Sequence, residues 1–202
     1  MTPTSRLRFL LATRNKGKAR EIRSALSPFN IELESLLERD DLPDALESGT
    51  TFAENARLKA EHYHHLTGLP TLAEDSGLVV DALDGKPGVH SARFAPTDKE
   101  RIEKLLRMLS SLPGPISRSA HFVSAVCLLL PDQLIEVAGK VSGELTQEPR
   151  GTHGFGYDPI FYYPPLGKTF AEITVEEKNQ ISHRAQALEA LRQRLTFLQG
   201  SP

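Results

Sequence analysis

The chain of 202 residues has a formal net charge of -2, a hydrophobic fraction of 39% and one cysteine. These values are ordinary for a globular protein and give no general attraction to nucleic acid or to an anionic membrane. One cysteine excludes an internal disulfide, and the apolar neighbours of Cys127 predict a buried, unreactive thiol. Arg6 and Arg8 interrupt the first apolar stretch, which argues against a secretory leader, and no apolar run is long enough for a membrane span. We therefore expect a cytoplasmic protein that binds anions only locally.

The first predicted element is a strand at 7–12, followed by a basic turn and a helix that contains Ile22 and Leu26. A helix that begins after a strand offers backbone amides and a positive dipole end to a phosphate. A P-loop is excluded, because Ala12 and Ala19 stand where that motif has glycine and a hydroxyl residue. A solvated basic turn without a ligand is the alternative. The candidate phosphate-binding residues of the turn are Thr13, Arg14, Asn15, Lys16, Gly17 and Lys18.

The next helix is predicted from a capping box. Thr51 and Glu54 open it, and Gly68 ends it. Asn55 and Lys59 lie one turn apart on this helix, so their side chains can point together at a ligand. A solvated polar face is the alternative interpretation.

Two carboxylates and a hydroxyl follow the apolar run 70–73, in the order Glu74, Asp75, Ser76, before Gly77. We expect the strand to end before Glu74 and the chain to turn at Gly77. Oxygen ligands of this kind suit a divalent cation. Because side chains alternate along a strand, Glu74 and Asp75 should diverge, so that only one, for which we choose Asp75, ligates the metal directly. A solvated turn is the alternative.

The middle of the chain carries further helix and strand signals. A second capping box at Thr97 and Glu100 opens a helix that we interpret as purely structural. Two long strands at 119–130 and 134–141 suggest a hairpin. Helix and strand signals alternate along the sequence, which predicts the α/β class.

The last candidate segments precede and open the C-terminal helix. Phe155 stands between two glycines in the segment 151–159, where its ring can stack on a flat base. The alternative is a tight loop with the ring packed in the core. The polar segment 176–184 then places His183 and Arg184 as adjacent donors near the start of the final amphipathic helix.

Together these segments resemble the inosine triphosphate pyrophosphatase family, house-cleaning enzymes that hydrolyse non-standard purine nucleoside triphosphates. Six motifs carry the resemblance, in the same order as in the family, and they cover nearly the whole chain. They are the segments 13–18, 51–60, 74–78, 85–94, 154–159 and 181–184. Two departures are small: Glu74 stands where many relatives have aspartate, and His153 where glycine is frequent.

The resemblance implies an α/β fold with a central elongated mixed β-sheet flanked by helices. It further implies a single domain, 1–202, of two lobes with the active-site cleft between them. The implied reaction is Mg²⁺-dependent hydrolysis of ITP, dITP and XTP to the nucleoside monophosphate and pyrophosphate, by attack at either the α or the β phosphorus. The implied assembly is a homodimer, and neither nucleic acid nor membrane is an expected partner.

The resemblance also assigns roles to residues. Asp75 is the implied general base and a metal ligand, Glu47 a second metal-binding carboxylate, and Glu74 a direct or water-mediated ligand. A cation beside Asp75 would lower its pKa, so we expect it to act on a water that the metal has activated. The implied substrate-binding residues are Thr13, Arg14, Asn15, Lys16, Gly17, Lys18, Asn55, Lys59, Ser76, Phe155, Gly156, Tyr157, Asp158, Lys178, His183 and Arg184.

Base selection follows from hydrogen-bond chemistry. Hypoxanthine and xanthine present a 6-oxo acceptor where adenine presents an amino donor, so Lys178, His183 and Arg184 would favour the former. Guanine has to be excluded at its 2-amino group. Two other functions stay open: hydrolysis of another modified nucleotide, and non-catalytic sensing of purine nucleotides.

Overall fold

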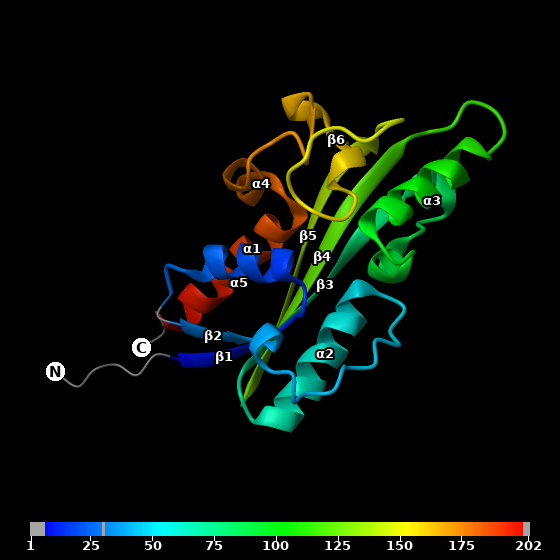
Figure 1. The fold of residues 1–202 in the computed structure, drawn as a ribbon. Helices are drawn as coiled ribbons and strands as arrows, with labels where there is room; N and C mark the ends of the chain where they lie inside the picture. Colours follow the sequence, from blue (N-terminus) through cyan, green and yellow to red (C-terminus); the bar gives the residue numbers. More distant parts are fainter. Residues whose placement is uncertain (1–6, 30, 200–202) are drawn as a thin grey trace. The chain divides into compact units, whose positions relative to one another are not determined.

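The structure is a computed structural model that describes residues 7–29 and 31–199 (Figure 1). Arg6, which entered the argument against a secretory leader, lies outside these residues. Within the described ranges, no helix combines the length and the apolar character needed to cross a bilayer.

Strands and α-helices alternate in the first half of the described chain, as the sequence pattern predicts, and are followed by four successive strands and then two α-helices. The strands are β1 (Leu7–Ala12), β2 (Ile31–Ser35), β3 (Thr71–Val80), β4 (Ser119–Leu130), β5 (Gln133–Leu145), β6 (Phe161–Tyr163) and β7 (Lys168–Thr169). The α-helices are α1 (Lys16–Leu26), α2 (Phe52–Thr67), α3 (Asp98–Ser110), α4 (Val175–Ile181) and α5 (His183–Gln199).

The strands form a seven-stranded sheet in the order β2-β1-β3-β4-β5-β6-β7. β1 is parallel to both β2 and β3, whereas β6 is antiparallel to both β5 and β7. The predicted class, α/β with a mixed sheet flanked by helices, is confirmed.

The chain divides into two compact units. In the described residues, the first unit comprises the chain up to Asp75, residues 125–139 and the chain from Gln186 onward. The second unit comprises residues 76–124 and 140–185. The predicted organisation as one domain of two lobes stays a prediction.

In the first unit, alternate residues of each strand face different helices. Phe9 and Leu11 of β1 pack with residues of α1 and α5, whereas Leu10 and Ala12 pack with residues of α2. This alternation follows from the two-residue period of a strand and places α2 on the opposite face of the sheet from α1 and α5 (Figure 1). Cys127 is buried on the α2 face, as predicted, and burial raises the pKa of its thiol to about 12.

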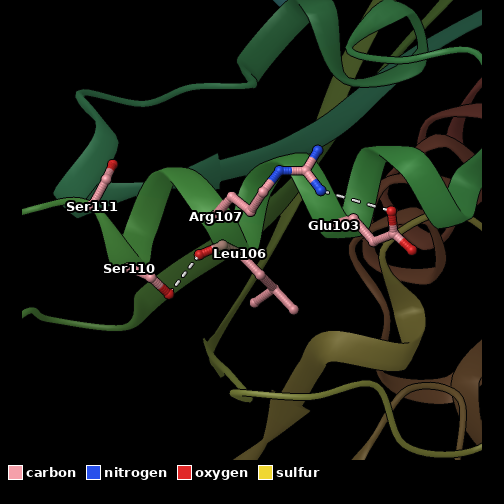
Figure 2. Close-up of a pocket in the computed structure, with 5 residues that line it drawn as sticks. All are labelled: Glu103, Leu106, Arg107, Ser110 and Ser111. Carbon is pink, nitrogen blue, oxygen red and sulfur yellow. Dashed lines mark hydrogen bonds and ion pairs between the residues drawn. The ribbon is translucent and has the colours of Figure 1, made fainter.

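The second unit has one apolar core. Ile102, Leu105 and Leu109 of α3 pack in this core with residues of β3, β4, β5 and β6. The capping box at Thr97 opens α3 as predicted. The outer face of α3 bears a hollow lined by Glu103, Leu106, Arg107, Ser110 and Ser111 (Figure 2).

Candidate active site

The strand that carries the two adjacent carboxylates is longer than expected. β3 continues through Glu74, Asp75 and Ser76 to Val80, so the prediction that the strand ends before Glu74 is wrong. The physical reason is that buried carboxylates are tolerated inside the strand because each has a lysine partner. Lys18 Nζ lies 2.8 Å from Glu74 Oε2, and Lys59 Nζ lies 3.2 Å from Asp75 Oδ1.

The two carboxylates diverge, as the alternation of a strand requires. Glu74 pairs with Lys18 of α1, and Asp75 pairs with Lys59 of α2, which pack on opposite faces of the sheet. The prediction that Glu74 and Asp75 point in different directions is therefore confirmed.

Lys59 connects three oxygen atoms from two segments of the first unit. Its Nζ donates to the carbonyl of Glu74 at 2.9 Å and lies 3.0 Å from Glu47 Oε1, in addition to its contact with Asp75. Burial alone would lower the pKa of Lys59, but the neighbouring carboxylates outweigh burial and raise it. The ammonium ion therefore stays charged and draws the carboxylates of Glu47 and Asp75 toward one point.

Asp75 is buried, with 6% of its surface exposed, and has a second partner on α2. Asn55 Nδ2 donates to Asp75 Oδ2 at 3.3 Å, so Asn55 and Lys59 do point together, as their spacing predicts. Burial raises the pKa of Asp75 and outweighs the opposing effects of Lys59 and Lys18. The expectation that a bound metal cation lowers this pKa stays a prediction.

The segment that carries Glu47 reaches α2 through its glycine. The amide of Gly49 donates to Asn55 Oδ1 at 2.8 Å. A Cβ at Gly49 would lie 2.7 Å from Glu54 Cβ, so only glycine permits this approach. Asn55 consequently contacts both Asp75 and the main chain next to Glu47.

The basic turn begins α1 as predicted, and several of its residues have structural partners. Asn15 caps the helix, since its Oδ1 accepts the amide of Lys18 at 3.0 Å. Thr13 Oγ1 accepts the amide of Asn15 at 3.1 Å, and Lys16 is exposed. Gly17 lies in the first turn of the helix. Lys18 is the residue of this turn that reaches a carboxylate of β3.

Arg14 does not point in the direction expected of a phosphate ligand. Its guanidinium donates to main-chain carbonyls of Leu36 and Leu42 and to the carboxylate of Asp44. The predicted phosphate-binding role of Arg14 has no support in these contacts, which join the basic turn to the acidic segment that precedes Glu47.

In the second unit, Phe155 lies on a loop that Asp158 shapes. One oxygen of Asp158, Oδ2, accepts the amide of Phe155 at 2.8 Å and the ammonium of Lys178 at 2.6 Å. Gly154 has φ of +76°, and a Cβ there would lie 2.1 Å from the same oxygen. The closeness of the loop to the carboxylate therefore requires glycine at position 154.

Phe155 is half-buried, so the alternative in which its ring is packed inside the core does not hold. Two cations lie near its ring: Lys178 Nζ is 4.8 Å from the ring centroid, and Arg184 Cζ is 5.7 Å from it. An aromatic ring next to donor cations has the character of a purine pocket, because it offers a flat face together with donors for a carbonyl oxygen.

Two further residues of the Phe155 loop, Gly156 and Tyr157, form hydrogen bonds to other parts of the second unit. The hydroxyl of Tyr157 donates to the carbonyl of Ser91 at 3.1 Å within the core, and burial raises its pKa. The amide of Gly156 donates to Asp98 Oδ2 at 2.8 Å. Their geometry makes them supports of the Phe155 loop, whereas the predicted direct contact with substrate stays untested.

The start of α5 places its two predicted donors differently. Arg184 is almost completely buried, and its guanidinium donates to Ser76 Oγ at 3.1 Å. The ring of His183 stacks on Phe122 with centroids 4.7 Å apart. Ser76 directly follows Asp75 in β3. Of these two consecutive residues, Asp75 contacts Lys59, and Ser76 contacts Arg184.

Comparison with known proteins decides the family. Residues 9–194 match the profile of the Ham1 family. The chain belongs to the Ham1 family. It is 48% identical over 96% of its length to a Symbiobacterium thermophilum protein named dITP/XTP pyrophosphatase, 98% of which is covered. A Geobacillus kaustophilus protein of the same name is 50% identical, with 90% of this chain and 91% of that protein covered.

Solved structures of Ham1 proteins have the same fold. The structure of a HAM1 protein from Coxiella burnetii matches with a TM-score of 0.86 and 44% identity, covering 94% of this chain and 98% of that one. The Staphylococcus aureus Ham1 protein matches with a TM-score of 0.82 and 38% identity, covering 96% and 98%. These matches confirm the family resemblance predicted from the motifs, and the names of the relatives match the predicted enzyme class, a nucleoside triphosphate pyrophosphatase.

The carboxylates of Glu47 and Asp75 are oxygen ligands of the kind that Mg²⁺ takes when it binds together with a nucleotide. In the part of the chain that the structure describes, no three His, Cys, Asp or Glu side chains are grouped as a complete metal site. Mg²⁺ usually takes one or two protein carboxylates, with phosphate and water oxygens completing its octahedron. The carboxylates of Glu47 and Asp75, which meet at the Lys59 ammonium, are such a pair.

Sequence reasoning missed Asp98 as a contributor to this region of the Ham1 chain. The sequence pattern predicts a purely structural role for the helix that begins at Asp98, yet Asp98 accepts the amide of Gly156 beside Phe155. No local pattern signals this bond, because its partners are far apart in the sequence. Gly49 and Gly154 carried a signal, since Gly49 lies two residues after Glu47, Gly154 directly precedes Phe155, and a close approach at each position requires glycine.

Proposed function

We propose that the protein hydrolyses dITP, XTP and ITP to the corresponding nucleoside monophosphate and pyrophosphate, with Mg²⁺ as its cofactor. The relatives named dITP/XTP pyrophosphatase support the substrate class. The observation that carries the proposal is the buried group in which Lys59 holds Asp75 and Glu47. A pure binder of a polyanion has little use for several carboxylates, whereas a hydrolase needs a base and metal ligands.

Asp75 is the base in this proposal. A carboxylate at this position can accept the proton of the attacking water. Asn55 and Lys59 fix the two oxygens of Asp75, so the carboxylate is oriented before substrate binds. Bound Mg²⁺, held by Asp75 and Glu47 with Glu74 nearby, would neutralise phosphate charge and lower the pKa of a coordinated water.

Lys18 and the start of α1 would bind the triphosphate. Lys18 already lies against Glu74, and the N-terminal end of α1 is favourable for anions. The purine would stack on Phe155, while Lys178 and Arg184 supply donors for the 6-oxo group. Adenine would present an amino donor to the same groups and would be rejected. A cytoplasmic location and a homodimer belong to the proposal as expectations from the family.

The test is pyrophosphate release from dITP, XTP, dATP and dGTP, each with and without Mg²⁺. We expect release from dITP and XTP that requires Mg²⁺ and that falls at least ~100-fold in Asp75→Asn. The control Asp132→Asn, in the exposed turn between β4 and β5, should keep wild-type activity. Tight binding of dITP without turnover would instead identify a sensor, and turnover of other modified nucleotides alone would assign a different substrate.

A further inference from the structure

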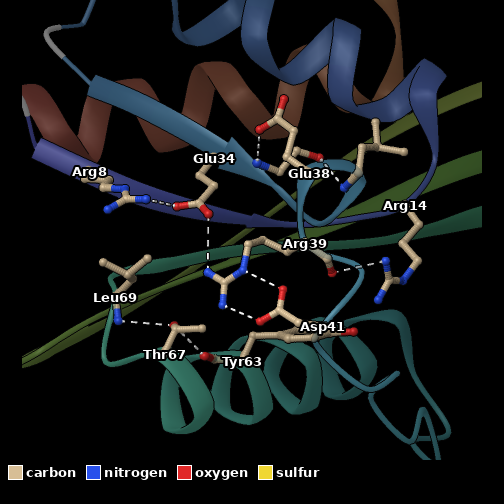
Figure 3. Close-up of polar contacts among 11 residues, drawn as sticks. Arg8, Arg14, Glu34, Glu38, Arg39, Asp41, Tyr63, Thr67 and Leu69 are labelled. Carbon is tan, nitrogen blue, oxygen red and sulfur yellow. Dashed lines mark hydrogen bonds and ion pairs between the residues drawn. The ribbon is translucent and has the colours of Figure 1, made fainter.

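Arg14 uses all three nitrogen atoms of its guanidinium on one segment of the first unit. Nε donates to Asp44 Oδ1 at 3.1 Å, and Nη2 donates to the carbonyl of Leu42 at 2.6 Å. Nη1 donates to the carbonyl of Leu36 at 2.9 Å and to that of Arg39 at 3.4 Å. Figure 3 shows the guanidinium directed toward the main chain at Arg39. One side chain thus holds a nine-residue span, 36–44, at four positions.

The segment that Arg14 holds leads directly to Glu47 and depends on such contacts for its position. Residues 43–49 form neither helix nor strand, so no ladder of backbone hydrogen bonds fixes them. Beyond Asp44, the amide of Ala45 donates to the Tyr63 hydroxyl at 3.3 Å, and Gly49 donates to Asn55. Glu47 lies between these two contacts. Arg14 is therefore one anchor on the N-terminal side of the segment that carries Glu47, together with the contact between His62 Nε2 and the Pro43 carbonyl at 3.3 Å.

We infer that Arg14 is a positioning residue, which places Glu47 against Lys59 by holding the segment 36–44. The inference rests on the proposed function, because the role of Glu47 as a metal-binding carboxylate belongs to that function. The three cations of the basic turn then have separate tasks. Arg14 fixes the acidic segment, Lys18 meets Glu74, and Lys16 is exposed to solvent and any polyanion.

A substitution that keeps the charge of Arg14 but changes the shape of its side chain can distinguish positioning of the segment from electrostatic attraction of phosphate. A lysine at position 14 keeps the positive charge but lacks the planar fork that reaches several carbonyls at once. Arg14→Lys should therefore behave like Arg14→Ala if the residue positions the segment. It should behave like the wild type if the residue only supplies charge.

The first measurement is hydrogen exchange of the metal-free protein, followed for the peptide that covers residues 40–49. We expect exchange there to become at least ~10-fold faster in Arg14→Lys and Arg14→Ala, while exchange in α5 stays unchanged. Arg20→Ala, which removes an exposed arginine from α1, should leave exchange in 40–49 as in the wild type. This measurement does not depend on catalysis, so it gives a result even if the proposed function fails.

The second measurement is a double-mutant cycle with Glu47→Gln, using pyrophosphate release from dITP. Arg14→Lys should lower kcat/KM at least ~10-fold alone but less than ~3-fold in the Glu47→Gln background, because both changes remove the same arrangement. Faster exchange together with this non-additive loss supports the inference. Unchanged exchange, or losses that multiply independently, overturns it. If the wild type releases no pyrophosphate from dITP or XTP, the proposed function fails, and the exchange measurement alone then decides whether Arg14 holds the segment 36–44.

Discussion

The ammonium of Lys59 lies 3.2 Å from Asp75 Oδ1 and 3.0 Å from Glu47 Oε1, so one buried cation joins carboxylates from two segments. Lys59 is only 8% exposed, and water therefore screens these charges weakly. Removal of one member of such a group leaves buried charge without compensation, which costs far more than the intact group contributes.

We expect Lys59→Gln to lower the free energy of unfolding by about 3 kcal/mol, because Asp75 and Glu47 lose their shared cation. It should also lower kcat/KM for dITP at least ~100-fold, since the base loses its orientation. Urea unfolding and pyrophosphate release measure the two effects. The matched control Lys99→Gln, whose side chain is 86% exposed on α3, should change stability by less than about 0.5 kcal/mol. Equal effects of both substitutions would contradict the buried-cation argument.

The raised pKa of Asp75 predicts how stability depends on pH in the metal-free protein. The folded state binds this proton more tightly than the unfolded state, in which the pKa is about 3.9. The contribution of Asp75 to stability is therefore fully present below about pH 4 and is lost as the pH rises through the raised pKa. The free energy of unfolding of the wild type should fall relative to that of Asp75→Asn over this interval. Urea unfolding between pH 3 and 8 with a chelator measures the difference. If the free energy of unfolding of the wild type instead rises relative to that of Asp75→Asn over this interval, the charges of Lys59 and Lys18 affect the pKa of Asp75 more than burial does.

Local signals predicted α2 and α3, because the residues that decide a helix start lie within one turn of it, whereas the separate short helix α4, opened by Thr174 and Glu177, was not predicted. Thr51 and Glu54 form a capping box at α2, and Thr97 and Glu100 form another at α3, as their spacing predicts. Apolar runs likewise predicted the strands at 7–12 and 119–130, which are β1 and β4.

The length of β3 and the direction of the Arg14 side chain depend on residues far away in the sequence, so local patterns could not predict them. β3 continues past Glu74 because Lys18 and Lys59, which neutralise its carboxylates, come from two helices elsewhere in the chain. Arg14 turns toward the acidic segment because that segment offers the carbonyls of Leu36 and Leu42 as acceptors, a property that no motif around position 14 encodes. Charge near a helix start thus predicted a basic site but not the direction of each side chain.

Glycine at position 154 should be indispensable for the shape of the Phe155 loop. Gly154→Ala adds a Cβ that would lie 2.1 Å from Asp158 Oδ2 at φ of +76°. We expect a loss of more than about 2 kcal/mol in the free energy of unfolding and a raised KM for dITP, because the loop has to move. Gly114→Ala is the matched control, since its φ is +78° but nothing lies within 4 Å of the added Cβ. It isolates the backbone strain, which costs about 1 to 2 kcal/mol. If the two substitutions cost the same and KM is unchanged, the clash with Asp158 has no consequence.

Arg184 should control the choice between 6-oxo and 6-amino purines. Its guanidinium lies by the Phe155 ring and donates to Ser76, so a positively charged donor group next to a purine stacked on Phe155 would favour a carbonyl oxygen over the amino group of adenine. We expect Arg184→Ala to lower the ratio of kcat/KM for dITP to that for dATP at least ~10-fold, and to lower turnover of dITP by a smaller factor. Because Arg184 is only 1% exposed, thermal unfolding has to show that the variant is folded, and Arg184→Lys provides a second variant that keeps the charge. Arg192→Ala, in the same helix but partly exposed, should leave the ratio unchanged. Equal losses on both nucleotides would show that Arg184 supports the structure without reading the base, and Lys178 would then be the donor to test next.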